Sequence, residues 1–398
     1  MREPIARHAA ARPRRVWASL LRGLAVVVAV LVVSSASLGG YAVWRLGRNT
    51  QDIAVPLAPH ETVPPPEALD GAFNVLLVGA DNEQGQHGFG AARDGTLNDV
   101  DILVHVAADH RSGVVISLPR DLEIPHPRCV DAATGATAPA VAKQQLNAAF
   151  SRGGLGCVVT TVESVLGLDI PYAAQFTFAG TVRMADAVGG VPVCVTKPVH
   201  DTKSGLSLPA GVSTISGRTA LAYLRARHKV GDNSDLARIQ SQQAYMSSLL
   251  RTMTSADTLT NPQRLYGLAT AATRNVVLSR SLADPTTLVR MAVSLKSVEL
   301  DRMVFVQYPT LPDPANDAKV VPDPVLAATL VDRVQRDRRI VLDDRALGDG
   351  VVAVGARPTP TPTATSSPSA APDRPRRGTV PGLKGRTAAQ QTCSVTHD

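Results

Sequence analysis

Cysteine is scarce in this chain of 398 residues, which has only Cys129, Cys157, Cys194 and Cys393. Four cysteines are too few for the dense disulfide framework of a small secreted domain, and none are spaced like the ligands of a zinc site. They remain compatible with an oxidising compartment. Cys129 and Cys157 flank a loop and a predicted helix, so we expect them to form a structural bridge. Cys194 follows an apolar strand pattern, and a buried free thiol is at least as good an interpretation for it.

The common signatures of hydrolases and nucleotide-binding enzymes are also missing. The sequence contains no GxSxG, no GxxxxGK and no HExxH motif. His105, His126 and His228 have no recognisable nucleophile beside them, and we interpret each as an ordinary half-buried side chain. These absences leave Asp and Arg as the main candidates for chemistry.

Positive charge is concentrated at the two ends of the chain. The formal net charge is +7, of which residues 1–22 carry +5 and residues 356–398 carry +4, leaving −2 for residues 23–355. A slightly negative central part does not offer the basic face that nucleic-acid binding needs. The charge distribution therefore argues against nucleic acid as a partner.

One stretch is long and apolar enough for a membrane segment. Residues 23–44 contain no Asp, Glu, Lys or Arg, and a helix of this length spans roughly 30 Å, the thickness of a hydrocarbon core. Because arginines crowd its N-terminal side, the positive-inside rule predicts residues 1–22 in the cytoplasm and the rest of the chain outside the cell membrane. A cleaved signal peptide is the alternative, since the strongest apolar run, 24–33, is short and small residues follow it at 34–37.

The rest of the chain divides by composition. Residues 45–71 include three consecutive prolines and few large apolar side chains, so we predict a stalk. Residues 348–398 are rich in Pro, Thr and Ser, which predicts a disordered tail that buries too little surface to fold. Residues 72–347 are then the folded extracytoplasmic domain.

Apolar runs and helical patterns are mixed within that domain. We predict strands at 73–79, 101–106, 113–118, 173–178 and 303–307, and helices at 140–151, 158–166, 216–226, 235–254, 261–274, 284–296 and 324–336. Strands apolar enough to be buried on both faces, mixed with helices, indicate an α/β sandwich.

Asp and Arg residues stand at the ends of the predicted strands. Asp81 follows the first strand, Asp99 precedes the second, and Arg120 and Asp121 follow the third. The ends of strands are where α/β sheets place ligand-binding groups, because the sheet holds them rigidly.

A second group lies further along the chain. On the helix predicted from 235, one face carries Asp235, Arg238 and Gln242. Arg225 and Arg227 would point about 200° apart on a helix, so we expect the preceding helix to end near them.

Arginines and aspartates together suggest one kind of ligand. Guanidinium groups bind phosphate oxygens in pairs, and carboxylates hold hard divalent cations that bridge such oxygens. The combination predicts a diphosphate site whose charges stabilise the leaving group. The alternative is ordinary surface ion pairs or, for Arg120 and Asp121, a pair that only pins the strand end.

Seven segments, taken in order, resemble the LytR-CpsA-Psr family of cell-wall glycopolymer ligases over roughly residues 72–255. The segments are NVLLVGAD (74–81), NDVDILVHV (98–106), VVISLPRD (114–121), LNAAFSRGG (146–154), MADAVGGVPV (184–193), SGRTALAYLRARH (216–228) and DLARIQSQQ (235–243). Each is unspecific alone, but the ordered set behind a membrane segment is typical of the family.

The resemblance implies a fold, a reaction and its partners. The fold is an αβα sandwich with a central mixed sheet and an apolar lipid cavity, preceded by one transmembrane helix. The reaction transfers a glycopolymer from polyprenyl diphosphate to peptidoglycan, typically to a muramic-acid 6-hydroxyl, with Mg²⁺ (or Mn²⁺) as cofactor. Polyprenyl diphosphate phosphatase activity accompanies it.

The resemblance also implies roles for individual residues. Asp81 and Asp99 correspond to the carboxylates of the metal site, and either could accept the proton of the attacking hydroxyl. The diphosphate-binding group comprises Arg120, Arg225, Arg227, Arg238 and Gln242. The expected catalytic residues are Asp99, Arg120, Arg227 and Arg238.

Two positions depart from the family pattern. Where members commonly carry Arg-Ser-Asp, this chain has Leu97-Asn98-Asp99, so one positive charge near the phosphates is absent. Where members often carry Lys, this chain has Gln145, with Lys143 two residues earlier. We expect substrate choice or catalytic strength to differ accordingly.

Two other functions remain open. Members of the family have been labelled transcriptional attenuators, but a cytoplasmic part of about 22 residues has no room for a helix-turn-helix. The other alternative is a non-catalytic protein that binds the cell wall through the same anion site.

Overall fold

The computed structural model describes residues 40, 48, 54–59, 61–81, 96–259, 261–343, 345–354 and 378–397. The chain divides into two units, residues 1–48 and 49–398, and the second contains all the elements below. The predicted membrane segment, the loop 82–95 and the Pro/Thr-rich stretch lie almost entirely outside the described residues. Among the helices that the structure does describe, none has the length and hydropathy to cross a bilayer.

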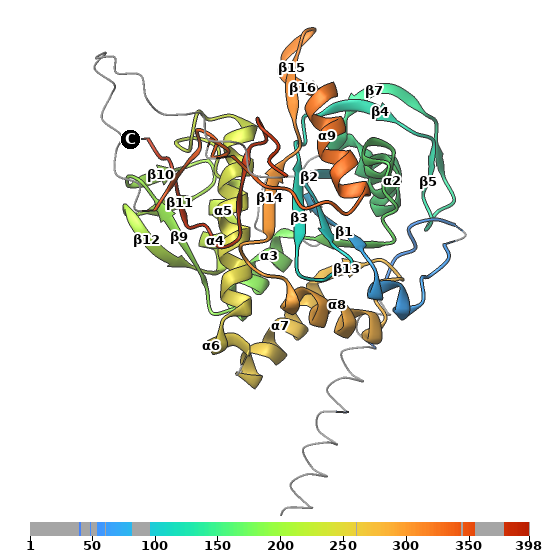
Figure 1. Ribbon diagram of the computed structural model, residues 1–398, viewed down its shortest axis with the longest axis horizontal. Helices are drawn as coiled ribbons and strands as arrows, with labels where there is room; N and C mark the ends of the chain where they lie inside the picture. The colour runs from blue at the N-terminus through green and yellow to red at the C-terminus, as the bar shows by residue number, and fades with distance from the viewer. Residues whose placement is uncertain are drawn as a thin grey trace, which may run out of the picture. The chain divides into compact units, whose positions relative to one another are not determined.

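A seven-stranded mixed sheet forms the centre of the domain (Figure 1). Its strands, in spatial order, are β13 (Val276–Leu278), β8 (Tyr172–Phe176), β1 (Phe73–Asp81), β2 (Leu97–Val106), β3 (Gly113–Leu118), β14 (Met303–Gln307) and β18 (Gly385–Thr387). Strands β1, β2 and β3 are antiparallel neighbours, whereas β8 and β14 run parallel to β1 and β3. The predicted central mixed sheet is confirmed.

Helices cover both faces of the sheet. The helices are α2 (Ala149–Leu166), α3 (Phe178–Ala187), α4 (Gly217–Arg225), α5 (Asp235–Thr254), α6 (Ala256–Leu259), α7 (Pro262–Asn275), α8 (Pro285–Ser297) and α9 (Pro324–Gln335), with 3-10 turns at Pro66–Asp70 and Leu146–Ala148. One apolar core packs α2 and α9 against the sheet, and a second packs α8 and part of α5 against the other face. The three layers follow from strands that bury apolar side chains on both sides.

A second sheet and several hairpins complete the domain. The second sheet contains β12 (Gly211–Ile215), β9 (Val191–Val195), β19 (Thr392–Ser394) and β17 (Val351–Ala353). The hairpins are β4 (Glu123–His126) with β7 (Val141–Gln145), β5 (Cys129–Val130) with β6 (Thr137–Ala138), β10 (Val199–Asp201) with β11 (Leu206–Leu208), and β15 (Thr310–Asp313) with β16 (Asn316–Pro322). Helix α5 contacts strands of both large sheets.

The prediction of a helix at 140–151 is wrong. Residues 141–145 form β7, and α2 begins only at Ala149. Strand β7 pairs with β4 in an exposed hairpin, so cross-strand hydrogen bonds decide the structure of a segment whose apolar pattern is ambiguous.

The predicted stalk is partly a piece of the domain. Leu57 is buried against α2, where Gly156 leaves the necessary room: a Cβ at Gly156 would lie 2.2 Å from the carbonyl oxygen of Leu57. Leu69 is buried in the core on the opposite face. Two well-placed leucines therefore suffice to dock a segment that is otherwise poor in large apolar residues.

The prediction of a disordered tail from 348 to 398 is also wrong at both of its ends. Strand β17 begins at Val351, β18 becomes an edge strand of the central sheet, and β19 joins the second sheet. The average composition of the tail hides these short segments, because each pairs with a strand that is distant in sequence.

Two disulfides link distant parts of the fold. The predicted bond between Cys129 and Cys157 is present. Cys194 is not a free thiol but is bonded to Cys393, which joins β9 to β19 across 199 residues of sequence. This second bond fixes the end of the chain to the domain.

The bond between Cys194 and Cys393 should stabilise the fold substantially. Replacing both residues by Ala should lower the free energy of unfolding by roughly 2–5 kcal/mol, because a very long loop becomes free in the unfolded chain. Urea denaturation of the full-length protein measures this change. The matched control, Cys129→Ala with Cys157→Ala, opens a loop of 28 residues and should cost less; an unchanged stability without Cys194 and Cys393 would contradict the expectation.

Candidate functional site

A bulge between β1 and β2 determines where Asp99 points. Gly79 is opposite Val100 and Ala80 is opposite Asn98, so Asp99 is the extra residue of β2. A bulge breaks the strict alternation of side chains and re-aims one of them. The approach is close, because a Cβ on Gly79 would lie 2.9 Å from the Cβ of Val100. Glycine at position 79 therefore permits the geometry that presents Asp99.

A buried polar group supports this bulge from the α2 side. The Asn98 side-chain amide donates to Asp101 Oδ2 (2.8 Å) and to the carbonyl of Leu146 (3.1 Å), and its Oδ1 accepts from the backbone N–H of Phe150 (3.0 Å). Burial raises the pKa of Asp101 well above its usual value, although the hydrogen bond from Asn98 opposes the shift. Asn98 thus holds the start of β2 in place.

Arg120 lies where β3 ends and reaches three carboxylates. Its Nη1 donates to Asp99 Oδ1 at 2.8 Å, and its Nε lies 3.5 Å from Asp121 Oδ2 and 3.5 Å from Asp235 Oδ1. The backbone carbonyl of Arg120 accepts from the N–H of Asn147, which ties the strand end to the turn before α2. Arg120 therefore connects the strand ends to α5.

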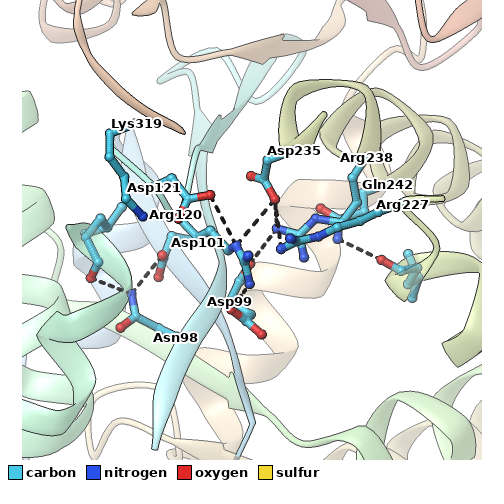
Figure 2. A network of polar contacts seen from close by, with 12 residues as sticks. Asn98, Asp99, Asp101, Arg120, Asp121, Arg227, Asp235, Arg238, Gln242 and Lys319 are labelled. Carbon is cyan, nitrogen blue, oxygen red and sulfur yellow. Dashed lines mark hydrogen bonds and ion pairs between the residues drawn. The ribbon is translucent and has the colours of Figure 1, made fainter. Parts of the chain in front are cut away.

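Asp235, in the first turn of α5, also contacts two further arginines (Figure 2). The side chain of Ser234 caps the helix by accepting from the N–H of Ala237 at 3.1 Å. Asp235 Oδ1 then lies 2.7 Å from Arg238 Nη2 and 3.2 Å from Arg227 Nη2. Arg227 follows the end of α4, as predicted. We call Asp99, Arg120, Arg227, Asp235 and Arg238 the arginine cluster.

Charge is unevenly balanced within the arginine cluster. Burial alone would lower the pKa of Arg120, but the carboxylates around it, chiefly those of Asp99 and Asp235, outweigh burial and raise it. Burial and the positive charges of Arg238 and Arg120 lower the pKa of Arg227, and the nearby carboxylates offset only part of this effect. The positive charge of Arg227 is thus less compensated than that of Arg120.

Arg225 and Gln242 also make contacts with residues outside the arginine cluster. The guanidinium carbon of Arg225 lies 4.6 Å from the centroid of the Phe178 ring, a cation–π contact with α3. Gln242 is buried and donates from Nε2 to the carbonyl of Leu224 at 2.9 Å, which fixes the end of α4 to α5. Their roles in binding a diphosphate stay predictions.

The prediction that His105 is half-buried is wrong, because the side chain is buried, although it does have the hydrogen-bond partners of an ordinary structural histidine. His105 is buried, with Nδ1 2.8 Å from Asn74 Oδ1 and Nε2 3.2 Å from Asp337 Oδ1. Burial lowers the pKa of His105 despite the contact with Asp337. His105 thus links β1, β2 and the segment after α9.

Two aspartates could hold a divalent cation. The backbone of Asp81 pairs with Leu97, so Asp81 and Asp99 come from adjacent ends of β1 and β2. Within the described part of the chain, no group of three or more His, Cys, Asp or Glu residues is placed to bind a metal. Two carboxylates suit Mg²⁺ or Mn²⁺ only if water supplies the other ligands, an arrangement that Mg²⁺ commonly adopts. The metal therefore remains a proposal.

One cavity of about 410 Å³ lies away from the arginine cluster. It is lined by residues from 301–304, 339–347 and 385–390. Val304 is paired with Val114 near the start of β3, whereas Arg120 follows the end of that strand. The cavity thus lies beside β14 and β18, no residue of the arginine cluster lines it, and the predicted lipid cavity stays a prediction.

Sequence reasoning missed the central role of Asp235. Its position was recognised on the face of α5, but its three ion pairs depend on a loop and a strand end that meet only in the fold. A spacing of three between Asp235 and Arg238 was the available signal. Lys319 was not singled out at all; it lies 3.2 Å from Asp121 Oδ1.

Comparison with known proteins shows the family of the chain. Residues 43–325 match the sequence model of the LytR_cpsA_psr family. The chain belongs to this family. The cell wall biosynthesis protein LcpA of Corynebacterium glutamicum is 30% identical over 296 residues, which cover 65% of this chain and 54% of LcpA. The chain thus spans about half the length of that relative.

Two further relatives extend the comparison. The polyisoprenyl-teichoic acid–peptidoglycan teichoic acid transferase TagT of Bacillus subtilis is 26% identical over 318 residues, or 77% of this chain and 91% of TagT. The structure of a LytR-Csp2A-Psr enzyme from Actinomyces oris superposes with a TM-score of 0.53 at 23% identity, covering 71% of this chain and 94% of that one. The latter similarity shows a shared mixed α/β fold.

Removal of Asp235 tests whether the arginine cluster is an anion site. In Asp235→Ala, three guanidinium groups would lose their shared carboxylate, and the free energy of unfolding should fall by roughly 3–5 kcal/mol. Added pyrophosphate should restore stability more strongly in the variant than in the wild type, because the anion takes the place of the carboxylate. Urea denaturation with and without pyrophosphate measures both effects.

The control for this variant is Asp332→Ala. Asp332 forms an exposed ion pair with Arg336 on α9, so its loss should change stability by less than about 1 kcal/mol. Equal stabilisation of both variants by pyrophosphate would show that the cluster does not bind the anion.

Proposed function

We propose that this protein is an extracytoplasmic phosphotransferase that moves a glycopolymer from a polyprenyl diphosphate carrier to peptidoglycan. The observation that carries the proposal is the convergence of Arg120, Arg227 and Arg238 on one carboxylate beside Asp99. Rigidly held guanidinium groups are suited to a diphosphate, since they match its oxygens in pairs and are already desolvated. The name of the relative TagT describes a transfer of the same class.

The proposed reaction breaks the bond between the two phosphates. A hydroxyl oxygen of peptidoglycan attacks the phosphorus that carries the glycan, the bridging P–O bond breaks with its electrons going to polyprenyl phosphate, and a phosphodiester forms. Asp99, which contacts Arg120 within the arginine cluster, would accept the proton of the hydroxyl. Arg227, which shares Asp235 with Arg238 and whose charge is less compensated than that of Arg120, would hold the oxygens on which negative charge grows.

The ion pairs of the free protein serve this reaction by orienting the arginines in advance. Asp235 keeps Arg227 and Arg238 directed to one point, so little reorganisation is needed when a diphosphate arrives. Mg²⁺, bound by Asp81 and Asp99, would supply additional positive charge to the phosphate oxygens. Polyprenyl diphosphate phosphatase activity would follow if water replaces the hydroxyl.

The lipid part of the donor requires an apolar environment next to the cluster. Helices α2 and α8 pack apolar faces against opposite sides of the sheet, and α5 extends from the cluster into the second of these cores. We propose that the polyprenyl chain enters along one of these faces. The apolar segment 23–44 would keep the domain at the outer surface of the cell membrane, where such a carrier resides.

Arg227→Ala should abolish transfer while the fold stays intact. Removing one of three mutually repelling charges costs little stability, whereas losing a charge that stabilises the transition state should lower kcat roughly 10²–10³-fold. The assay incubates the full-length protein in detergent with a polyprenyl-diphosphate oligosaccharide, peptidoglycan fragments and Mg²⁺, and measures released polyprenyl phosphate. The full chain is needed because β18 and β19 belong to the domain.

Arg336→Ala is the matched control, since Arg336 is exposed on the distant helix α9. It should turn over like the wild type. Unchanged turnover in Arg227→Ala would contradict the catalytic role. The non-catalytic wall-binding alternative would be favoured by a different result: the wild type and the variants unfold at the same temperature and bind the donor, but none of them turns it over.

A further inference from the structure

A hairpin borders the arginine cluster on the side away from α5. Strand β16 is attached to the residues that follow β3: the N–H of Val320 donates to the carbonyl of Asp121 at 3.3 Å, and Val320 bridges to Leu122. The hairpin of β15 and β16 projects from the body of the domain (Figure 1). Its tip, residues 314–318, is exposed and polar except for Pro and Ala.

A separate set of contacts holds this hairpin close to its turn, where Asp313 ends β15. Lys143 on β7 bonds to the buried carboxylate of Asp313 and lies 2.7 Å from Glu123 Oε2 on β4. These three residues hold the hairpin to the neighbouring β4–β7 pair. The hairpin therefore has a structural ion-pair group that does not involve the arginine cluster.

Lys319 lies on β16 of the same hairpin and faces the arginine cluster instead. Its Nζ lies 3.2 Å from Asp121 Oδ1, and the other oxygen of that carboxylate lies 3.5 Å from Arg120 Nε. Lys319 and Arg227 lie on opposite sides of Arg120 (Figure 2). Lysine and arginine side chains thus form a row with Lys319 at one end. Asp121 lies between Lys319 and Arg120, and Asp235 lies between Arg120 and the pair Arg227 and Arg238.

Charge along this row depends on Lys319. The row contains Arg120, Arg227, Arg238 and Lys319 against the three carboxylates of Asp99, Asp121 and Asp235. Without Lys319, cations and carboxylates would be equal in number. The side chain of Lys319 is 19% exposed. Water therefore screens its charge only in part, and a ligand can still reach it.

We propose that Lys319 forms a subsite for an anionic group carried by the glycan of the donor, a phosphate or a carboxylate on the sugars next to the diphosphate. This inference rests on the proposed function. A row of cations longer than one diphosphate suits a ligand with a further negative charge along its length. The glycan rather than the lipid should lie on this side, because the charged groups of Lys319 and Asp121 face the row here and offer no burial for isoprene units.

Lys319→Met tests the subsite, and Lys143→Met is its matched control. Each variant removes a lysine ion pair that involves this hairpin, Lys319 with Asp121 or Lys143 with Asp313. Only Lys319 faces the arginine cluster. The full-length protein in detergent is assayed with three donors on the same polyprenyl diphosphate: a phosphate-bearing oligosaccharide, a uronate-bearing oligosaccharide and a neutral one. Thermal unfolding of each variant reports on the fold.

We expect Lys319→Met to raise KM roughly tenfold for one or both anionic donors, with kcat and the KM of the neutral donor nearly unchanged. The anionic donor that responds identifies the group as phosphate or carboxylate. Lys143→Met should lower the unfolding temperature without this selective change. An equal rise in KM for all three donors would place Lys319 on the diphosphate and overturn the subsite.

Two other outcomes are also decisive. Identical behaviour of the two lysine variants would mean that Lys319 only pins the hairpin, and the subsite would be rejected. If Arg227→Ala turns over all three donors normally, the proposed function itself fails, whatever Lys319 does. Loss of activity in Arg227→Ala with unchanged KM values in Lys319→Met rejects the subsite alone.

Discussion

The carboxylate of Asp235 is the constraint on which the site depends. Two like charges about 4 Å apart repel by roughly 4 kcal/mol at the effective dielectric constant of a protein surface, and Arg238 is almost fully buried. Three guanidinium groups can share this small volume only because Asp235 Oδ1 lies between them. In the free protein, a carboxylate of the chain itself thus holds the three arginines together. The diphosphate proposed as the ligand would have to share these arginines with Asp235.

Backbone geometry supplies the second requirement, a carboxylate aimed at the same point. Regular alternation along β2 would place Asp99 on the same face as Asp101, beneath the sheet against α2. The extra residue in the strand lets Asn98 take that inward position and leaves Asp99 to meet Arg120. The departure Leu97-Asn98-Asp99 therefore has a structural meaning: the side-chain amide at position 98 donates both to Oδ2 of the buried Asp101 and to the turn before α2.

Local periodicity predicted much of the fold and of the site. The apolar runs of β1, β2, β3 and β14 and the face of α5 were readable because burial repeats along the chain with the period of the element. The end of α4 at Arg225 followed from the same argument. The bulge at Asp99, the meeting of Asp235 with Arg120, and the approach of Lys319 were not readable. Each depends on register or on packing between segments far apart in sequence.

The C-terminal segment shows most clearly why composition fails, and it matters for the site. Strands β18 and β19 have three residues each, too short for a pattern, and their partners lie up to about 200 residues earlier. Yet Arg386 is buried beneath α5, where it donates to the carbonyl of Gln240 at 2.8 Å. Burial lowers the pKa of Arg386 to about 10, so the side chain remains charged at neutral pH and needs a hydrogen-bond acceptor such as the Gln240 carbonyl.

The same segment also joins the two helices that flank the cluster. The hydroxyl groups of Tyr223 on α4 and Ser394 on β19 lie 2.6 Å apart, and Ser394 donates to Ser241 on α5 at 3.0 Å. These C-terminal residues thus fix α4 and α5 to each other about one helical turn from Arg227 and Arg238. Catalytic geometry tolerates errors of only about 0.5 Å, so the residues that follow the Pro/Thr-rich stretch are as much a part of the site's framework as the central sheet.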